Sequence, residues 1–159
     1  RCRARRAVPV PPIAQPREKP PRQDRTTTMQ AALQSQTEWN RACIFDQSGQ
    51  VLASSGQIAP NDIKVFTTAF NDKDTTFGQG LNVNGQNYEV HRFYEEEGLI
   101  YGRTHSVDPN DGEGIAMHRV KKSSNGQVVY GVVTYRFPIL SAKAVPDLQA
   151  FMAQHVAST

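Results

Sequence analysis

Side chains that could carry out catalysis are scattered along this 159-residue sequence. Its histidines stand at four separate places: His91, His105, His118 and His155. They form no metal-ligand spacing and no serine–histidine–aspartate order. GQG at 78–80 is too short for a phosphate-binding loop, and the glutamates at 95–97 are typical of a solvated turn. We therefore predict no catalytic site, no metal site and no cofactor, and a protein that is not an enzyme.

The two cysteines, Cys2 and Cys43, belong to no CxxC motif and predict a reduced, cytoplasmic chain with one buried thiol. No apolar run reaches the length of a membrane span, and the longest notable one is VVYGVV at 128–133. The arginines near the beginning are not followed by an apolar stretch, so the sequence predicts no signal peptide.

Positive charge is concentrated near the beginning of the sequence. Residues 1–25 contain eight of the 18 lysines and arginines and only two acids, Glu18 and Asp24, which gives +6. The remaining ten basic and 13 acidic residues give −3, so the pI near 9.0 reflects the N-terminal segment. A mildly acidic body without a basic element predicts no nucleic-acid binding. The basic segment itself could be attracted to anionic lipid, another protein or polyphosphate.

The stretch AVPVPPIAQPREKPP at 7–21 has proline at six of fifteen positions. Proline favours the extended polyproline II helix, and this segment has too little apolar surface to offset the entropy of folding. We predict a disordered, basic, proline-rich extension over residues 1–28 and one compact domain over residues 29–159. The stretch could be a tether, a ligand for another protein or a ligand for its own domain.

Three segments have the spacing of helices. MQAALQSQ at 29–36 has good helix formers, and 60–70 repeats apolar residues at helical spacing after Asn61, a predicted N-cap. The segment 146–156 is also predicted to be a helix, with Pro146 at its first position.

Between these segments the sequence alternates like strands joined by turns. Two apolar runs flank DQSG within 42–54, and Asn84-Gly85 is the preferred dipeptide of a type I′ hairpin. A further strand is predicted at 99–104, and strands at 112–120 and 127–137 flank a second Asn-Gly pair, Asn125-Gly126. The order of elements predicts an α+β domain, in which helices cover an antiparallel sheet.

Five of these stretches, in this order, resemble the profilin family of small actin-monomer-binding proteins. ACIFDQSGQVLASSG resembles the family's first hairpin, and QGLNVNGQNYEV resembles its hairpin with Gly, Leu, Gly, Tyr and Val at fixed places. LIYGRT and GEGIAMHRV resemble the next two strands, and QVVYGVV resembles the strand before the last helix. The resemblance covers about residues 29–157. It implies a central antiparallel sheet with the N- and C-terminal helices on one face and shorter helices on the other.

The sequence also departs from the family pattern. The first helix lacks aromatic residues, and Leu52 stands where many profilins carry tryptophan. Tyr101 stands where the family has arginine, with Arg103 two positions later, and HSVDPND at 105–111 lengthens a loop. These are features of a divergent member, for which an archaeal origin is one interpretation.

The resemblance implies an actin-binding surface made by the central strands and the start of the last helix. By position, its residues are Tyr88, His91, Arg92, Arg103, His118, Arg119 and Lys143. Basic side chains there would meet an acidic partner surface and orient it. The alternative is an ordinary solvated face of a sheet whose other face is buried.

The resemblance also implies a polyproline groove between the terminal helices, where aromatic rings meet proline rings and N–H groups donate to ligand carbonyls. Its predicted residues are Phe151, Trp39, the only indole, and His155 as a second donor. The alternative is that Trp39 and Phe151 only pack the helices against the sheet.

Arg119, Lys121 and Lys122 are predicted to contact phosphoinositide head groups, which bind many profilins.

The sequence therefore predicts a monomeric, cytoplasmic regulator of the actin cytoskeleton. It would bind actin monomers together with proline-rich elongation factors, and the proline-rich extension would be an autoregulatory ligand of the groove. The alternative is a small-ligand sensor of the PAS kind, which is also an antiparallel sheet flanked by helices and would need an internal cavity.

Overall fold

The computed structural model describes residues 25–159, and the predicted extension up to residue 24 lies outside them. The strands within these residues are β1 (Arg41–Asp46), β2 (Val51–Ser55), β3 (Leu81–Val83), β4 (Gln86–Tyr94), β5 (Leu99–Arg103), β6 (Glu113–Lys121) and β7 (Val128–Arg136). They form one sheet in the order β2-β1-β7-β6-β5-β4-β3, and every neighbouring pair is antiparallel.

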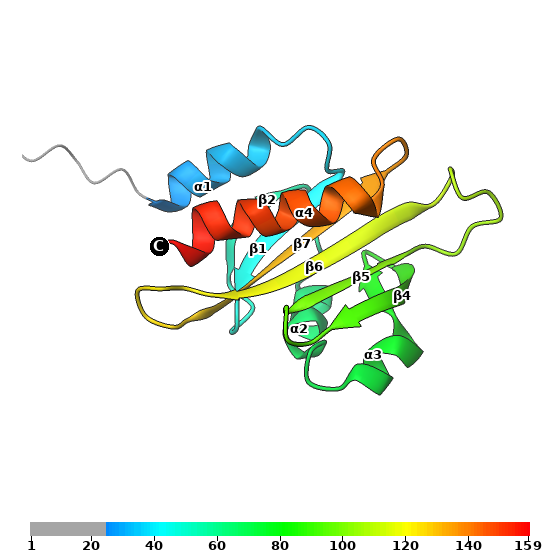
Figure 1. Ribbon diagram of the computed structural model, residues 1–159, viewed down its shortest axis with the longest axis horizontal. Helices are drawn as coiled ribbons and strands as arrows, with labels where there is room; N and C mark the ends of the chain where they lie inside the picture. The colour runs from blue at the N-terminus through cyan, green and yellow to red at the C-terminus, as the bar shows by residue number, and fades with distance from the viewer. Residues whose placement is uncertain (1–24) are drawn as a thin grey trace, which may run out of the picture.

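The helices of residues 25–159 are α1 (Arg25–Gln34), α2 (Pro60–Thr68), α3 (Lys73–Gln79) and α4 (Ser141–Met152), which continues into a π-helix, η1 (Ala153–Ala157). Figure 1 shows α1 and α4 side by side on one face of the sheet and α2 and α3 on the other. This confirms the predicted α+β arrangement. None of the helices in the described part combines the length and the apolar character needed to cross a bilayer.

Each face of the sheet has its own buried core, because helices cover both. Along β1, Ile44 packs towards α1 and α4, whereas Phe45 packs towards α2. On the second side the Phe45 ring is stacked between two others, 6.2 Å from that of Phe66 and 5.5 Å from that of Tyr130. A strand that is buried on both faces loses the apolar–polar alternation of a half-exposed strand.

The first Asn-Gly pair forms the predicted tight hairpin between β3 and β4, since Asn84 and Gly85 have φ angles of 51° and 85°. The second pair behaves differently. The hairpin of β6 and β7 is present, but residues 122–127 connect the strands, and only Gly126 there has a positive φ, 69°. The side chain of Asn125 instead accepts a hydrogen bond from the backbone N–H of Gln127.

Three helix starts differ from the prediction. The first helix begins at Arg25 rather than Met29. In α2 the N-cap is Ala59 and not Asn61, because Pro60 suits the first helical position. The last helix begins at Ser141, so Pro146 lies inside it. Its early turn is stabilised by the buried side chains Ala144 and Val145, and this packing outweighs the hydrogen bond that proline cannot donate.

Candidate protein-binding surfaces

The sheet has an uncovered area beside α4. On that side α1 packs on β2, and α4 packs mainly on β6 and β7. Residues paired across antiparallel strands point to the same side, so the register places Arg92 beside Tyr101, and Tyr94 beside Leu99 and His118. We call this area the open strand face. Its uncovered side chains are Glu89, His91, Arg92, Tyr94, Tyr101, Arg103 and His118.

A bulge in β4 makes this surface. The register shifts between Val90 and Arg92, so His91 is an extra residue, and both His91 and Arg92 are exposed. Together with Tyr101 they line a shallow hollow. Tyr94, 40% exposed, packs its ring 6.2 Å from that of Tyr101. Neither tyrosine was predicted from the sequence as a contact residue, although Tyr94 follows Arg92 by two positions and Tyr101 precedes Arg103 by two, a spacing that puts strand residues on the same side.

Two predicted residues of this face also hold the structure together. The guanidinium of Arg103 donates to the carbonyl oxygens of Pro109 and Gly112, the latter at 3.1 Å, and so fastens the inserted loop at 105–111. The Nδ1 atom of His118 lies 3.1 Å from the carbonyl oxygen of Gly98. Burial lowers the pKa of His118, so its ring is neutral at pH 7.

Three other residues that were predicted for actin contact lie elsewhere. Tyr88 is fully buried, and its hydroxyl donates to the Glu113 carboxylate at 2.7 Å, so we leave it out of the contact surface. Arg119 lies on the opposite side of the sheet, with its guanidinium 4.4 Å from the centre of the Phe70 ring. Lys143 lies on α4, where its ammonium is bound by two carboxylates.

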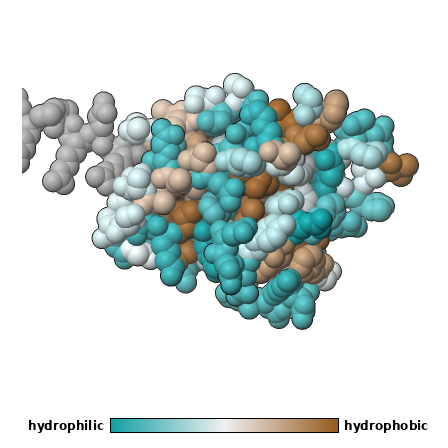
Figure 2. Space-filling model, in the orientation of Figure 1, coloured by the Kyte–Doolittle hydropathy of each residue, from teal (hydrophilic) through white to brown (hydrophobic). Residues whose placement is uncertain are grey.

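A groove runs along α4 and η1 on the α1 side. One part, a hollow of about 290 Å³, lies between α4 and the connection from α1 to β1. A second part, of about 130 Å³, lies between α1, η1 and the β6–β7 connection. The two hollows adjoin at His155, which lines both of them. We call the two hollows together the helix groove. The face of the molecule that carries α4 mixes hydrophobic and hydrophilic side chains (Figure 2).

The predicted aromatic residues meet at this groove, but two of them are largely buried. The Phe151 ring centroid lies 5.7 Å from that of Trp39, edge to face, and 4.5 Å from that of His155. Phe151 is 4% exposed and Trp39 6%. Phe151 and His155 line the groove, whereas Trp39 lines neither hollow. Trp39 therefore packs behind Phe151, which agrees with the alternative that it packs the helices against the sheet. His155, which is half-buried, is the most accessible of the three side chains.

The three basic residues predicted for lipid contact are not gathered in one patch. Arg119 faces α2 and α3, where it covers Phe70. Lys122 lines the helix groove near His155, on the other side of the sheet. Lys121 is exposed. Since charge attraction to a head group depends on nearby basic groups acting together, this separation weakens the expected contact.

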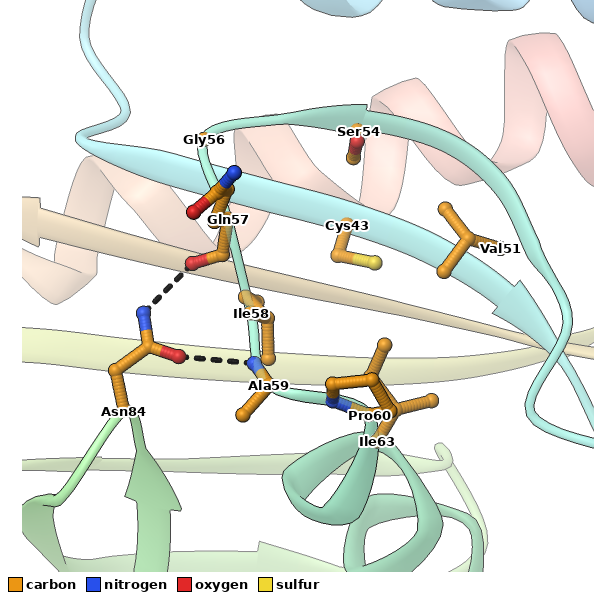
Figure 3. A pocket seen from close by; sticks show the side chains of 10 residues that line it. All are labelled: Cys43, Val51, Ser54, Gly56, Gln57, Ile58, Ala59, Pro60, Ile63 and Asn84. Carbon is orange, nitrogen blue, oxygen red and sulfur yellow. Dashed lines mark hydrogen bonds between the residues drawn. The ribbon is translucent and has the colours of Figure 1, made fainter.

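A separate cleft of about 480 Å³ lies between β2 and the start of α2 (Figure 3). The Asn84 side chain forms one end of it and bonds to the Gln57 carbonyl oxygen at 2.7 Å and the Ala59 N–H at 2.8 Å. Burial raises the pKa of the Cys43 thiol in its wall to about 12, so the thiol stays protonated. This cleft opens beside an edge strand rather than inside the core, unlike the internal cavity expected of a PAS-like sensor.

These features define a class: a small α+β binding module whose terminal helices share one face of an antiparallel sheet. The Profilin family model matches residues 26–125. The chain belongs to the profilin family, which confirms the resemblance seen in the sequence.

Solved structures share the fold. Schizosaccharomyces pombe profilin is 23% identical, with a TM-score of 0.63 over 82% of this chain and 95% of that one. Acanthamoeba castellanii profilin II is 18% identical, with a TM-score of 0.62 over 82% and 94%. LokiProfilin1 in its complex with rabbit actin is 12% identical, with a TM-score of 0.58 over 81% and 92%. No curated protein sequence matches this chain significantly.

Proposed function

We propose that this profilin binds actin monomers through the open strand face and so regulates their assembly in the cytoplasm. The observation that carries the proposal is the uncovered area of β4 and β5, where exposed Arg92 and His91 stand beside two tyrosines. Tyrosine and arginine are among the residue types that contribute most to binding at protein interfaces. A protein of the same fold, LokiProfilin1, has been solved with rabbit actin, which supports actin as the partner.

The protein is expected to slow the spontaneous assembly of pyrene-labelled actin, and Arg92→Glu is expected to weaken this effect. Reversing a charge in a complementary interface costs several kcal/mol at most, so we expect binding of actin to weaken about tenfold or more. The matched control is Lys64→Glu, the same charge change at an exposed position of α2 on the opposite face. If the unmodified protein leaves assembly unchanged, or if both variants weaken binding equally, the proposed surface is wrong.

We also propose that the helix groove binds proline-rich segments, such as those of elongation factors that would receive the bound actin. Phe151 and His155 support this, since an aromatic edge and a half-exposed ring N–H are the groups that such a ligand needs. The burial of Trp39 leaves His155 as the main donor of the predicted set. Phosphoinositide binding stays a prediction from the sequence.

The proline-rich segment at 7–21 is proposed to be a ligand of this groove. Thr26, at the start of α1, lines the groove, so the segment is joined to the domain next to it. A short tether gives an effective concentration on the order of millimolar, which lets weak binding compete with external ligands.

Deleting residues 1–24 is expected to shift the amide resonances of α4 and η1 and to tighten binding of a neutral proline decapeptide a few-fold. Removing an internal competitor has both effects. Nuclear magnetic resonance titration of the two proteins measures them. Unchanged resonances would reject self-docking, while decapeptide shifts mapped to Phe151 and His155 would still support the groove.

A further inference from the structure

Four side chains form a stripe along the wall of the helix groove: Lys143, Asp147, Phe151 and His155. They recur every fourth residue, which places them on one side of α4 and η1. The charged pair stands on the first half of the stripe and the aromatic pair on the second. A ligand that contacts both halves would therefore meet an ionic site about one helical turn or more from the aromatic contact.

The charged half is completed by Glu38 from the connection between α1 and β1. The Lys143 ammonium lies 2.6 Å from a carboxylate oxygen of Glu38 and 2.6 Å from one of Asp147. The hydrogen bonds that the Lys143 ammonium donates to Asp147 and Glu38 raise the pKa of Lys143, so its ammonium is charged at neutral pH. One positive and two negative charges leave a net charge of −1 at this end of the groove.

The two carboxylates keep capacity to bind a further cation. Each is shown bonded to Lys143 through one oxygen, and neither second oxygen accepts a hydrogen bond from another residue of the described part. Their side chains are 41% and 39% exposed, so an incoming group can reach them. The other end of the groove carries Lys122, which makes the two ends electrically different.

The dimensions fit a polyproline II ligand. From a point midway between Phe151 and His155, Asp147 lies six residues back along the helix, which is about 9 Å at 1.5 Å per residue. One turn of polyproline II is three residues, also about 9 Å. A residue one ligand turn from a proline that contacts Phe151 and His155 would therefore face Glu38 and Asp147.

We propose that the helix groove selects proline-rich segments that carry a lysine or arginine one turn from the bound prolines, and that Glu38, Asp147 and Lys143 together set this preference. This specificity rests on the proposed binding of proline-rich segments by the same groove. Exposed ion pairs have modest energies, so we expect an arginine ligand to bind about two- to fivefold more tightly than its glutamate counterpart.

The test uses the full chain and three peptides of ten prolines with one central guest residue: arginine, glutamine or glutamate. Affinities are measured by calorimetry for a graded series in which the net charge of the ionic site changes. The net charge of the site is −2 in Lys143→Gln, −1 in the unmodified protein and 0 in Glu38→Gln. It is +1 in the double variant Glu38→Gln with Asp147→Asn. The ratio of arginine to glutamate affinity is expected to fall along this order, to reach about one at zero charge and to invert at +1.

The matched control is Glu96→Gln in the exposed β4–β5 turn, which removes one carboxylate away from the groove and is expected to keep the unmodified ratio. If the ratio of arginine to glutamate affinity is the same in all variants while the glutamine peptide still binds, the charge preference is wrong. The proposal that the groove binds proline-rich segments would then still hold. Binding of none of the peptides to any variant would overturn both proposals.

Discussion

Replacing Gly102 with alanine is expected to lower the free energy of unfolding by about 3 kcal/mol or more, because the new side chain would have no room. Gly102 is buried in β5 opposite Val90. An added Cβ would overlap the carbonyl oxygen of Glu89 and lie 3.0 Å from the Val90 Cα. These are backbone atoms of β4, which can move away only if the β4–β5 hydrogen bonds break.

Urea unfolding measures this effect, and Gly78→Ala is its matched control. Gly78 lies within α3, where an added Cβ meets nothing within 4 Å. Alanine there is expected to be neutral or to stabilise the protein by up to about 1 kcal/mol, since alanine favours helix more than glycine does. Equal stabilities of the two variants would contradict the close approach of β4 and β5.

Because these strands carry Arg92 and Tyr101, Gly102→Ala is also expected to abolish actin binding.

The second large effect is expected at Glu113, where alanine should lower the free energy of unfolding by about 3 kcal/mol. Glu113 is 5% exposed. Its carboxylate accepts hydrogen bonds from the Tyr88 hydroxyl at 2.7 Å, from Arg136 Nε at 2.7 Å and from Arg41 at 3.3 Å. Truncation would leave the buried Tyr88 hydroxyl without its acceptor. The melting temperature should fall by about 10 °C, and Glu96→Ala, in an exposed turn, should leave it unchanged.

The same network predicts a pH dependence. Burial by itself would raise the pKa of Glu113, but hydrogen bonds from Tyr88 and Arg136 outweigh it and lower the pKa below its usual value. The stabilisation is therefore complete above the unfolded-state pKa of about 4.3 and is lost as the pH falls through the lower folded-state value. The stability difference between the unmodified protein and Glu113→Gln should shrink in that acidic range. A difference that stays constant down to pH 2 would contradict this role.

Local chemistry was sufficient to predict the elements that short stretches of chain decide. Asn84-Gly85 forms its tight hairpin because these two residues tolerate positive φ angles. The DQSG turn is present because the Asp46 carboxylate accepts hydrogen bonds from the backbone N–H groups of Ser48 and Gln50. Local preference was overruled where packing was stronger, as at Pro146, which lies inside a helix whose first turns are buried against the sheet.

The candidate surfaces were only partly predictable, because they depend on which face of each strand a helix covers. His118 and Arg119 are neighbours in the sequence, yet one lies on the open strand face and the other against Phe70. Tyr88 was predicted for the contact surface from its position in the family pattern, but its side chain belongs to the buried core beneath α2. The bulge at His91 then reverses the alternation for Arg92 and Tyr94.

The sequence by itself determined the antiparallel sheet and the terminal helices, since these follow from the periodicity and turn residues of short segments, and its motifs showed the resemblance to the family. The tertiary structure alone decided which side chains work together. Lys143 meets Glu38 across 105 positions of the chain, and Glu113 meets Arg41 across 72. Such pairs are set by the order of strands and the packing of helices on them, and no local pattern of residues records either.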